Sequence, residues 1–343
     1  MLRNKLAVLL ATLLPTMLCA QTIDHSVVPL MTQVSQIEHI NPKKYSKEQF
    51  AEIRQALSQS SDKIRVVSYN VLFNLHDAKL DPQYRWPQRL PRIVALIREM
   101  KADIVSVQEP YAEQVQDLLA LLGDDYDFFP DECGQRECNG IFIKRSRFER
   151  ISGRSMSMKQ RADTRPSGKL TLLHIKDKKT GNCFLVCNTH LSFAKAEQRA
   201  AQAHFVVSQL KPYLNTIPIF FTGDLNTFPP RLDLKSLPFN DGAYIDRIFT
   251  RAGYQDARTV SVLGHLGPLS TFTNHAQSPV AFSGTGTPGV FLDHIYVSPE
   301  VSVLIHAVQS ALVDKLYASD HFPVLIDAVV PNNPKACACS IAP

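Results

Sequence analysis

The sequence lacks a strong excess of either charge. Its 343 residues carry a formal net charge of +5, and removing Arg3 and Lys5 with a predicted signal peptide lowers this to +3. No block of more than three like charges occurs, as a basic or acidic tail would require. Charge alone therefore gives no argument for a polyanionic partner.

Other absences exclude whole classes of protein. No Gly-x-Ser-x-Gly sequence occurs, which disfavours a serine esterase whose nucleophile stands on a strand-to-helix turn. No pair of cysteines or histidines has the spacing of a zinc site. No internal repeat is visible, and no segment beyond the first twenty residues is long and apolar enough to span a bilayer.

The N-terminus has the parts of a signal peptide. A basic start precedes an apolar run over residues 6–14, and Cys19-Ala20 forms a small-residue cleavage site. We therefore predict removal of residues 1–20 on export and a secreted or periplasmic mature protein. A buried N-terminal helix is the alternative. A lipid anchor on Cys19 is disfavoured because Leu18 is large where such a site has a small residue.

Three segments follow the signal peptide. Residues 21–62 form a polar N-terminal extension with one helical stretch at 46–59, residues 63–330 form the main domain, and residues 331–343 form a tail. Nothing in the sequence indicates an oligomer, so we expect a monomer. Residues 264–289 form a long loop rich in Gly, Ser, Thr and Pro, which either overhangs the site or is a passive surface excursion.

The mature chain keeps an even number of cysteines, which permits disulfides in an exported protein. Cys133 and Cys138 are close enough in sequence to close a small loop. Cys183 and Cys187 share one face of a predicted strand about 13 Å apart, too far to bridge each other, and fit better as small buried hydrophobes. The remaining pair, Cys337 and Cys339, lies either in a disulfide or in a frayed tail.

Four predicted apolar strands each end on a polar side chain that could bind a metal ion or take part in catalysis. The strands are residues 63–70, 103–109, 182–190 and 217–226, and they end on Asn70, Glu109, His190, and Asp224 with Asn226. Helices are predicted at 86–102, 113–123 and 195–214. Further strands are predicted at 140–145, 168–177 and 289–298.

The last predicted strand, 319–330, reverses this order and begins with Asp320-His321. A strand that begins where the others end lies antiparallel to them. All five polar groups are then expected at one edge of a mixed sheet or sandwich.

These groups indicate phosphoryl chemistry. Carboxylate and amide oxygens without thiolates suit Mg²⁺, Mn²⁺ or Ca²⁺. Two histidines, His190 and His321, are then available for a substrate anion. A metal, cations around a phosphate and a carboxylate that positions water together serve phosphate-ester hydrolysis.

The motifs "SVQEP", "NTHLS", "GDLN" and "SDHFP", in this order and each on the expected element, resemble the endonuclease/exonuclease/phosphatase superfamily. It includes pancreatic-type DNases, abasic-site endonucleases, neutral sphingomyelinases and inositol polyphosphate phosphatases. The resemblance covers roughly residues 63–330. It implies an α/β (α+β) fold, a four-layer α/β/β/α sandwich of two mixed, mainly antiparallel sheets flanked by helices.

The resemblance also implies a role for each site residue. The metal ligands would be Asn70, Glu109 and Asp320, with Mg²⁺ as the expected ion and Mn²⁺ or Ca²⁺ as alternatives. Asp224 would position and deprotonate the attacking water. The groups implied to bind phosphate or to hold these side chains in place are Asn70, Glu137, Arg165, His190, Asn226, Asp293 and His321. Within this set Glu137 would orient His190, Asp293 would orient His321, and Arg165 would contact the phosphate.

The function implied is an exported, metal-dependent phosphodiesterase that attacks phosphorus in line with water, without a covalent intermediate. Nucleic acid, DNA or RNA, is the favoured substrate, and a phospholipid, as in a sphingomyelinase, or a phosphatase substrate is the alternative. A catalytically inactive binding protein is disfavoured because all the expected positions are filled. Two residues beside these motifs stay open: Arg89 faces either the cleft or solvent, and His294 is expected to be structural.

Overall fold

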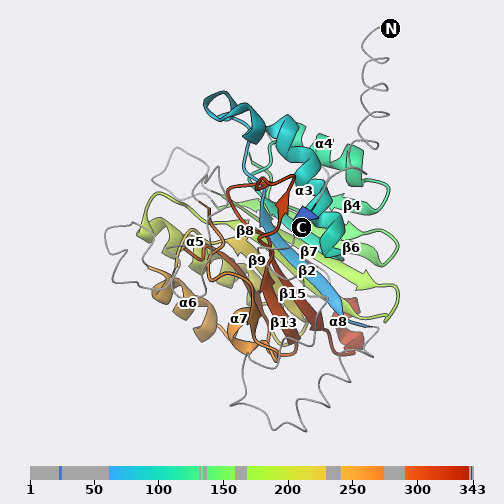
Figure 1. The fold of residues 1–343 in the computed structure, drawn as a ribbon. Helices are drawn as coiled ribbons and strands as arrows, with labels where there is room; N and C mark the ends of the chain where they lie inside the picture. The colour runs from blue at the N-terminus through green and yellow to red at the C-terminus, as the bar shows by residue number, and fades with distance from the viewer. Residues whose placement is uncertain are drawn as a thin grey trace.

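The computed structural model describes residues 23–24, 62–130, 133, 137–158, 168–228, 241–273, 290–339 and 341. Two large sheets lie face to face in it, with helices on both outer sides (Figure 1). Among the described residues, no helix combines the length and apolarity needed to cross a membrane.

The larger sheet has seven strands and contains the strands that end on Asn70 and Glu109. Its central pair, β2 and β3, is parallel, and β15 lies antiparallel to β2. In spatial order the strands are β11 (His265–Leu266), β13 (Ser302–Val308), β15 (Val324–Val329), β2 (Ile64–Asn70), β3 (Ile104–Gln108), β5 (Gly140–Lys144) and β4 (Tyr126–Phe129).

The second sheet has six strands and carries His190 and Asp224. Here β8 and β9 are parallel, while β12 lies antiparallel to β9. In spatial order the strands are β10 (Gln255–Asp256), β12 (Asp293–Val297), β9 (Ile219–Asp224), β8 (Cys183–His190), β7 (Lys169–Asp177) and β6 (Phe148–Ser157). A short pair, β1 (Ile23–Asp24) and β14 (Leu312–Val313), stands apart from both sheets.

Helices close the outer faces of the two sheets. Figure 1 shows α3 and α4 at the top, and α5 and α6 at the left. The helices are α3 (Trp86–Met100), α4 (Ala112–Leu122), α5 (Ala196–Leu210), α6 (Gly242–Arg251), α7 (Ala257–Val260) and α8 (Pro334–Ala338), with 3-10 turns η2 (Asp77–Lys79) and η3 (Pro82–Tyr84).

Three hydrophobic cores separate these four layers. One lies between α3, α4 and the seven-stranded sheet, a second lies between the sheets, and a third lies between the six-stranded sheet and α5 and α6. Central strands are buried on both faces, so they read as continuous apolar runs. The expected four-layer sandwich of mixed, mainly antiparallel sheets is confirmed.

Three strands of four or more residues were not predicted, and the start of one was misplaced. Strands β4 and β13 were missed, although β13 is mostly apolar and lies between β11 and β15. The strand β6 was not foreseen because its residues are mostly polar and most of them are exposed, as befits an edge strand. The last strand begins at Val324, not at Ser319, so Asp320 and His321 stand in the turn before β15.

The cysteines form two disulfides among the described residues. Cys133 pairs with Cys138, closing the small loop that the sequence permitted. Cys183 pairs with Cys337, so reading Cys183 as a simple buried hydrophobe is wrong. Strand β8 passes close to α8, 154 residues later, and only the folded chain brings these two sulfurs together. Cys187 is a buried free thiol, as expected.

Several predictions fall outside the described residues. These are the signal peptide at 1–20, the helical stretch at 46–59, the substrate-binding role of Arg165, and the loop beyond residue 273.

Candidate active site

Asn70 joins the two sheets at their shared edge. Its amide nitrogen lies 3.0 Å from Glu109 Oε1 and 3.0 Å from Asp224 Oδ2, so one side chain donates to carboxylates from both sheets. Its amide oxygen accepts from the backbone N–H of Leu72. In this orientation Asn70 positions the carboxylates, while its role as a metal ligand stays a prediction.

Glu109 stands directly after β3 in a left-handed backbone conformation, with φ of 74°. This turn aims its carboxylate back at Asn70, and its second oxygen accepts from the N–H of Phe73 at 3.1 Å. Burial raises the pKa of Glu109 to about 7; His190 opposes this rise and Asp320 adds to it. The raised pKa of Glu109 therefore reflects its burial close to another carboxylate.

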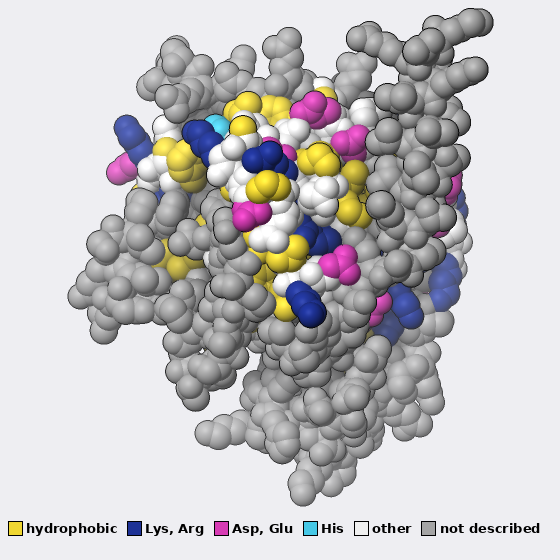
Figure 2. Space-filling model, turned by 45° about the horizontal axis from the view of Figure 1, so that its top comes forward, with side chains coloured by type: hydrophobic (Ala, Val, Ile, Leu, Met, Phe, Trp, Pro, Cys, Tyr) yellow, Lys and Arg dark blue, Asp and Glu magenta, His cyan; other side chains and the backbone are white. Residues whose placement is uncertain are grey.

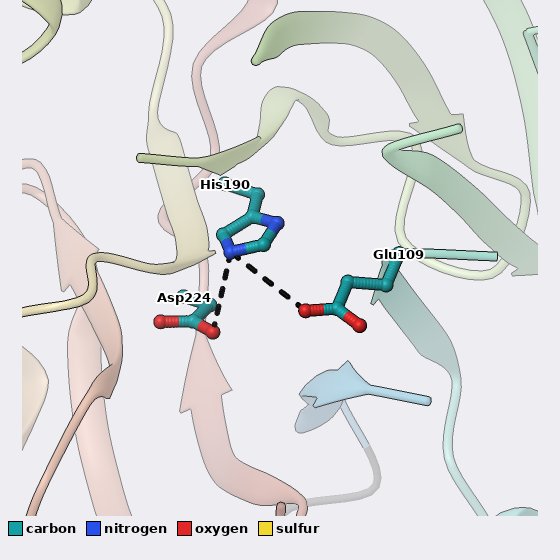
Figure 3. Close-up of side chains that lie close together, drawn as sticks. All are labelled: Glu109, His190 and Asp224. Atoms are coloured by element: carbon teal, nitrogen blue, oxygen red, sulfur yellow. Dashed lines mark ion pairs between the residues drawn. The ribbon is translucent and has the colours of Figure 1, made fainter. Parts of the chain in front are cut away.

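His190, at the end of β8, lies between three acidic side chains. Its Nε2 is 3.5 Å from Asp224 and 3.9 Å from Glu109 (Figure 3), and its Nδ1 is 3.2 Å from Glu137. Burial alone would lower the pKa of this imidazole, but Glu137 and Asp224 outweigh it and raise the pKa to about 10. The expected contact of Glu137 with His190 is present.

Asp224 ends β9 and is almost completely buried. Its Oδ1 accepts from the backbone N–H of Asn226, whose φ of 49° folds the chain back over the carboxylate. The side chain of Asn226 faces His190, with its amide nitrogen 2.8 Å from Nε2. Asn226 was predicted to hold Asp224, which it contacts through its backbone N–H, and to bind phosphate, which stays a prediction; its side-chain contact with His190 was not foreseen.

His321 is held from behind by Asp293. The distance from Nδ1 to Asp293 Oδ2 is 2.8 Å, and the opposite nitrogen lies 3.6 Å from Asp224. Asp293 reaches this place because β12 pairs with β9 so that Asp293 lies directly opposite Asp224. Burial would lower the pKa of His321, but Asp293 and Asp224 outweigh it and raise the pKa well above its usual value.

Asp320 lies beside the cluster and is connected to it through Ser319. The Ser319 hydroxyl lies 2.8 Å from the carbonyl oxygen of Asn70, to which it donates, and 3.2 Å from Asp320 Oδ1. Sequence reasoning passed over Ser319, although its place directly before the Asp-His pair was a usable signal. The metal-ligand role of Asp320 stays a prediction.

The donor set fits a hard divalent cation. In the described part of the chain, two groups could hold a metal ion, Glu109 with His190 and Asp224, and Asp224 with Asp293 and His321. Carboxylate oxygens dominate both, thiolates are absent from both, and the buried Oδ1 of Asp293 has no hydrogen-bond partner. A cation here would neutralise part of the negative charge of the carboxylates, which is unfavourable in a buried position.

Two open residues are resolved. Arg89 is 1% exposed and bonds to backbone carbonyls, so it faces neither cleft nor solvent. His294 points away from the catalytic side chains toward Asp256, with 3.8 Å between the nearest atoms, as expected for a structural residue.

Comparison with known proteins agrees with this geometry. The model of the endonuclease/exonuclease/phosphatase family matches residues 67–321, which include every described residue of the site. The chain belongs to this family. Enzymes of the family hydrolyse phosphoesters and typically use divalent metals. Among curated proteins, no sequence matches the chain.

Solved structures share the family fold. An endonuclease/exonuclease/phosphatase from Bacteroides vulgatus is 23% identical with a TM-score of 0.65, covering 78% of this chain and 99% of its own. A mannosyl-6-phosphatase from Bacteroides thetaiotaomicron is also 23% identical, with a TM-score of 0.62 and coverage of 78% and 99%. TDP2 from D. rerio, complexed with a single-strand DNA product, is 19% identical with a TM-score of 0.56 and coverage of 78% and 98%.

Proposed function

We propose that the protein is a divalent-metal-dependent phosphoester hydrolase that attacks phosphorus with water. The observation that carries this proposal is the convergence of two imidazoles on one buried carboxylate, because His190 and His321 lie 3.5 and 3.6 Å from the same oxygen of Asp224. Such an arrangement places a base and two cationic donors around one point. Hydrolysis of a phosphoester uses a base to activate water and cationic donors to stabilise the charge on the phosphate oxygens.

Asp224 is the proposed base. Its Oδ1 accepts from the N–H of Asn226. Its Oδ2, which also accepts from the Asn70 amide, faces the imidazoles and can take the proton of a water. Asp293 holds the proton on His321 Nδ1, so that Nε2–H points toward the substrate oxygen. The metal, held by Glu109 and its neighbours, would supply Lewis-acid polarisation of the phosphate.

The contact of Asn226 with His190 also supports anion binding. A protonated His190 and the Asn226 amide present two donors to each other at 2.8 Å, and the amide also donates to the carbonyl of Leu191. Two converging donors are unfavourable unless an acceptor lies beside them, and the carboxylates of Asp224 and Glu109 lie 3.5 and 3.9 Å from Nε2. A non-bridging phosphate oxygen would be a further acceptor for both donors.

Nucleic acid is our first candidate substrate, and the DNA product named for the D. rerio structure supports it. On the upper face, over α3 and α4, described acidic and basic side chains are interspersed with hydrophobic ones, so the face adds no extended basic surface to that argument (Figure 2). A phosphomonoester is the second candidate, supported by the mannosyl-6-phosphatase, which has the higher TM-score.

A phospholipid is the third candidate. Leu75 and Phe193 are 65% and 67% exposed and stand five and three residues after Asn70 and His190. Exposed apolar side chains on loops beside a site suit a lipid substrate.

We also propose that the mature enzyme acts outside the cytoplasm. The signal-peptide pattern of residues 1–20 is the reason, and two disulfides in the described chain support it because such bonds persist in oxidising compartments.

The test is a hydrolysis assay of the mature protein with Mg²⁺ and with EDTA. The panel contains plasmid DNA, single-stranded DNA, RNA, a sugar 6-phosphate and sphingomyelin. We expect metal-dependent release of product from at least one substrate, which also selects among the candidates. No metal-dependent hydrolysis of any of the five would contradict the proposal.

A further inference from the structure

A buried arginine and a buried glutamine hold the chain segment that follows Asn70. This segment, residues 71–74, is called the strap here. Arg89 of α3 is 1% exposed and Gln114 of α4 is fully buried, so both side chains lie in the layer between the helices and the seven-stranded sheet. Neither is part of the catalytic cluster.

The strap is held on its outer side by these two residues. The Arg89 guanidinium donates to Val71 O at 2.5 Å and to Leu72 O at 3.0 Å, and Gln114 Nε2 donates to Leu72 O at 3.1 Å. Gln114 Oε1 also accepts from the N–H of Asn74 at 3.1 Å. These bonds fix a segment in which Leu72 has a φ of 56°, a conformation that a leucine does not favour.

On its inner side the strap holds the site. The N–H of Leu72 donates to Asn70 Oδ1 at 3.0 Å, and the N–H of Phe73 donates to Glu109 Oε2 at 3.1 Å. The first bond determines that the amide nitrogen of Asn70, not its oxygen, faces the carboxylates. The second fixes one oxygen of Glu109.

We propose that Arg89 and Gln114 are positioning residues for the carboxylate cluster: by clamping the carbonyls of the strap, they aim two backbone N–H groups at Asn70 and Glu109. This inference rests on the proposed function for its consequence, because the cluster is the proposed metal site. Partners behind the ligands of a metal typically contribute about 10- to 100-fold to metal affinity. The sequence hides this role, since the contacts are made to backbone atoms.

Three conservative variants test the clamp. Arg89→Lys keeps the charge but loses the planar fork that reaches two carbonyls at once. Gln114→Glu keeps the acceptor for Asn74 and loses the donor to Leu72 O. Arg92→Lys is the matched control, because Arg92 is a second buried arginine on α3, 4% exposed, that donates to the carbonyl of Gln83, outside the strap.

The measurements are Mn²⁺ binding by titration calorimetry without substrate, hydrogen–deuterium exchange of the peptide covering the strap, and urea unfolding. We expect Mn²⁺ affinity to fall about 10-fold or more in Arg89→Lys and Gln114→Glu, with faster exchange in the strap. Arg92→Lys should lower the urea midpoint and leave both the affinity and the strap unchanged.

The outcomes separate two failures. If wild-type protein binds Mn²⁺ and both clamp variants bind it equally well, the inference is overturned while the proposed function stands. If Arg89→Lys does not fold, Gln114→Glu decides alone. If the folded wild-type protein binds no Mn²⁺, the proposed metal site itself is wrong, and the clamp has nothing to position.

Discussion

Asp224 is the residue on which the site converges. The Asn70 amide donates to one of its oxygens, and His190 and His321 approach the same oxygen. Each imidazole carries a raised pKa because carboxylates surround it, His190 through Glu137 and His321 through Asp293, although burial opposes the rise. The acids behind the two imidazoles therefore favour their protonated form, which carries the positive charge that the proposed phosphate binding requires.

Removing one imidazole should abolish most of the activity. In His321→Ala we expect turnover to fall about 10²–10³-fold, the usual effect of losing one group that stabilises transition-state charge. The thermal midpoint should fall, because the buried carboxylate of Asp293 loses its partner, so turnover is measured at a temperature where the variant is folded. His204→Ala, at an exposed position on α5, is the control. Wild-type turnover in purified His321→Ala would contradict the assignment.

Replacing the acid behind His321 should move the pH dependence. In Asp293→Asn the carboxylate that raises the pKa of His321 is lost, so that pKa falls. Because the proposed mechanism uses the protonated imidazole, the alkaline limb of the rate profile should shift to lower pH. The profile of turnover against pH measures this, and an alkaline limb unchanged from wild type would count against the role of Asp293.

At the scale of elements, strands were easier to predict than the connections between them. The strand β2 is buried on both faces and ends on Asn70, so the sequence predicted both the strand and its last residue. Edge strand β6 has no such run. Burial of Arg89 depends on carbonyls of a turn and a neighbouring loop, which no local pattern specifies. The sequence could suggest side chains for the site but not the backbone N–H groups that hold them.

A pair of histidines joins β11 to β13 and should make stability depend on pH. His265 and His306 lie opposite each other with 2.9 Å between their Nδ1 atoms, a contact that needs at least one neutral ring. Burial lowers the pKa of both rings in the folded state below the usual 6.5.

Below pH 6.5 the unfolded chain therefore binds more protons than the folded one, and stability is lost as pH falls. Between pH 7.5 and pH 5.5, values chosen to bracket about 6.5, we expect this pair to contribute a decline in the urea midpoint. Glu109, whose pKa is raised to about 7, acts in the opposite direction over the same range, so the readout is the difference between wild type and His306→Gln. The decline should be smaller in His306→Gln. An equal decline in the two proteins would show that other groups control it.

The disulfide between Cys183 and Cys337 ties α8 to β8 across 154 residues of sequence. A cross-link that closes a long loop typically stabilises by about 2–4 kcal/mol, so Cys337→Ala should lower the free energy of unfolding by that amount. Cys133→Ala should cost less, because its bridge spans five residues. Urea unfolding of both variants provides the comparison, and a larger loss in Cys133→Ala would contradict it.

At the scale of the molecule, the two sheets are joined by a buried polar contact beneath the site. Asn188 of β8 donates to the carbonyls of Val107 and Gly140 in the other sheet and accepts from Gln108 at 2.7 Å. Asn188→Leu would fill the space and leave these groups unpaired, at a cost of about 1–3 kcal/mol for each buried group without a partner.

We expect Asn188→Leu to lower both the urea midpoint and the turnover, since Gln108 immediately precedes Glu109 in the chain. Urea unfolding and the hydrolysis assay measure the two effects. A variant as stable and as active as wild type would show that the contact does not join the sheets.

The bond pattern of Asn70 has a consequence for how such a chain could be divided. Glu109 arrives from one sheet and Asp224 from the other, and a single amide spans the seam between them. A fragment that retained only one sheet would lack an ordered site. Asp224 would be separated from the Asn70 amide that donates to it, and Asn70 would keep only Glu109. The proposed hydrolysis thus requires both sheets to be in contact, and the appearance of activity during refolding would report when the two sheets come together.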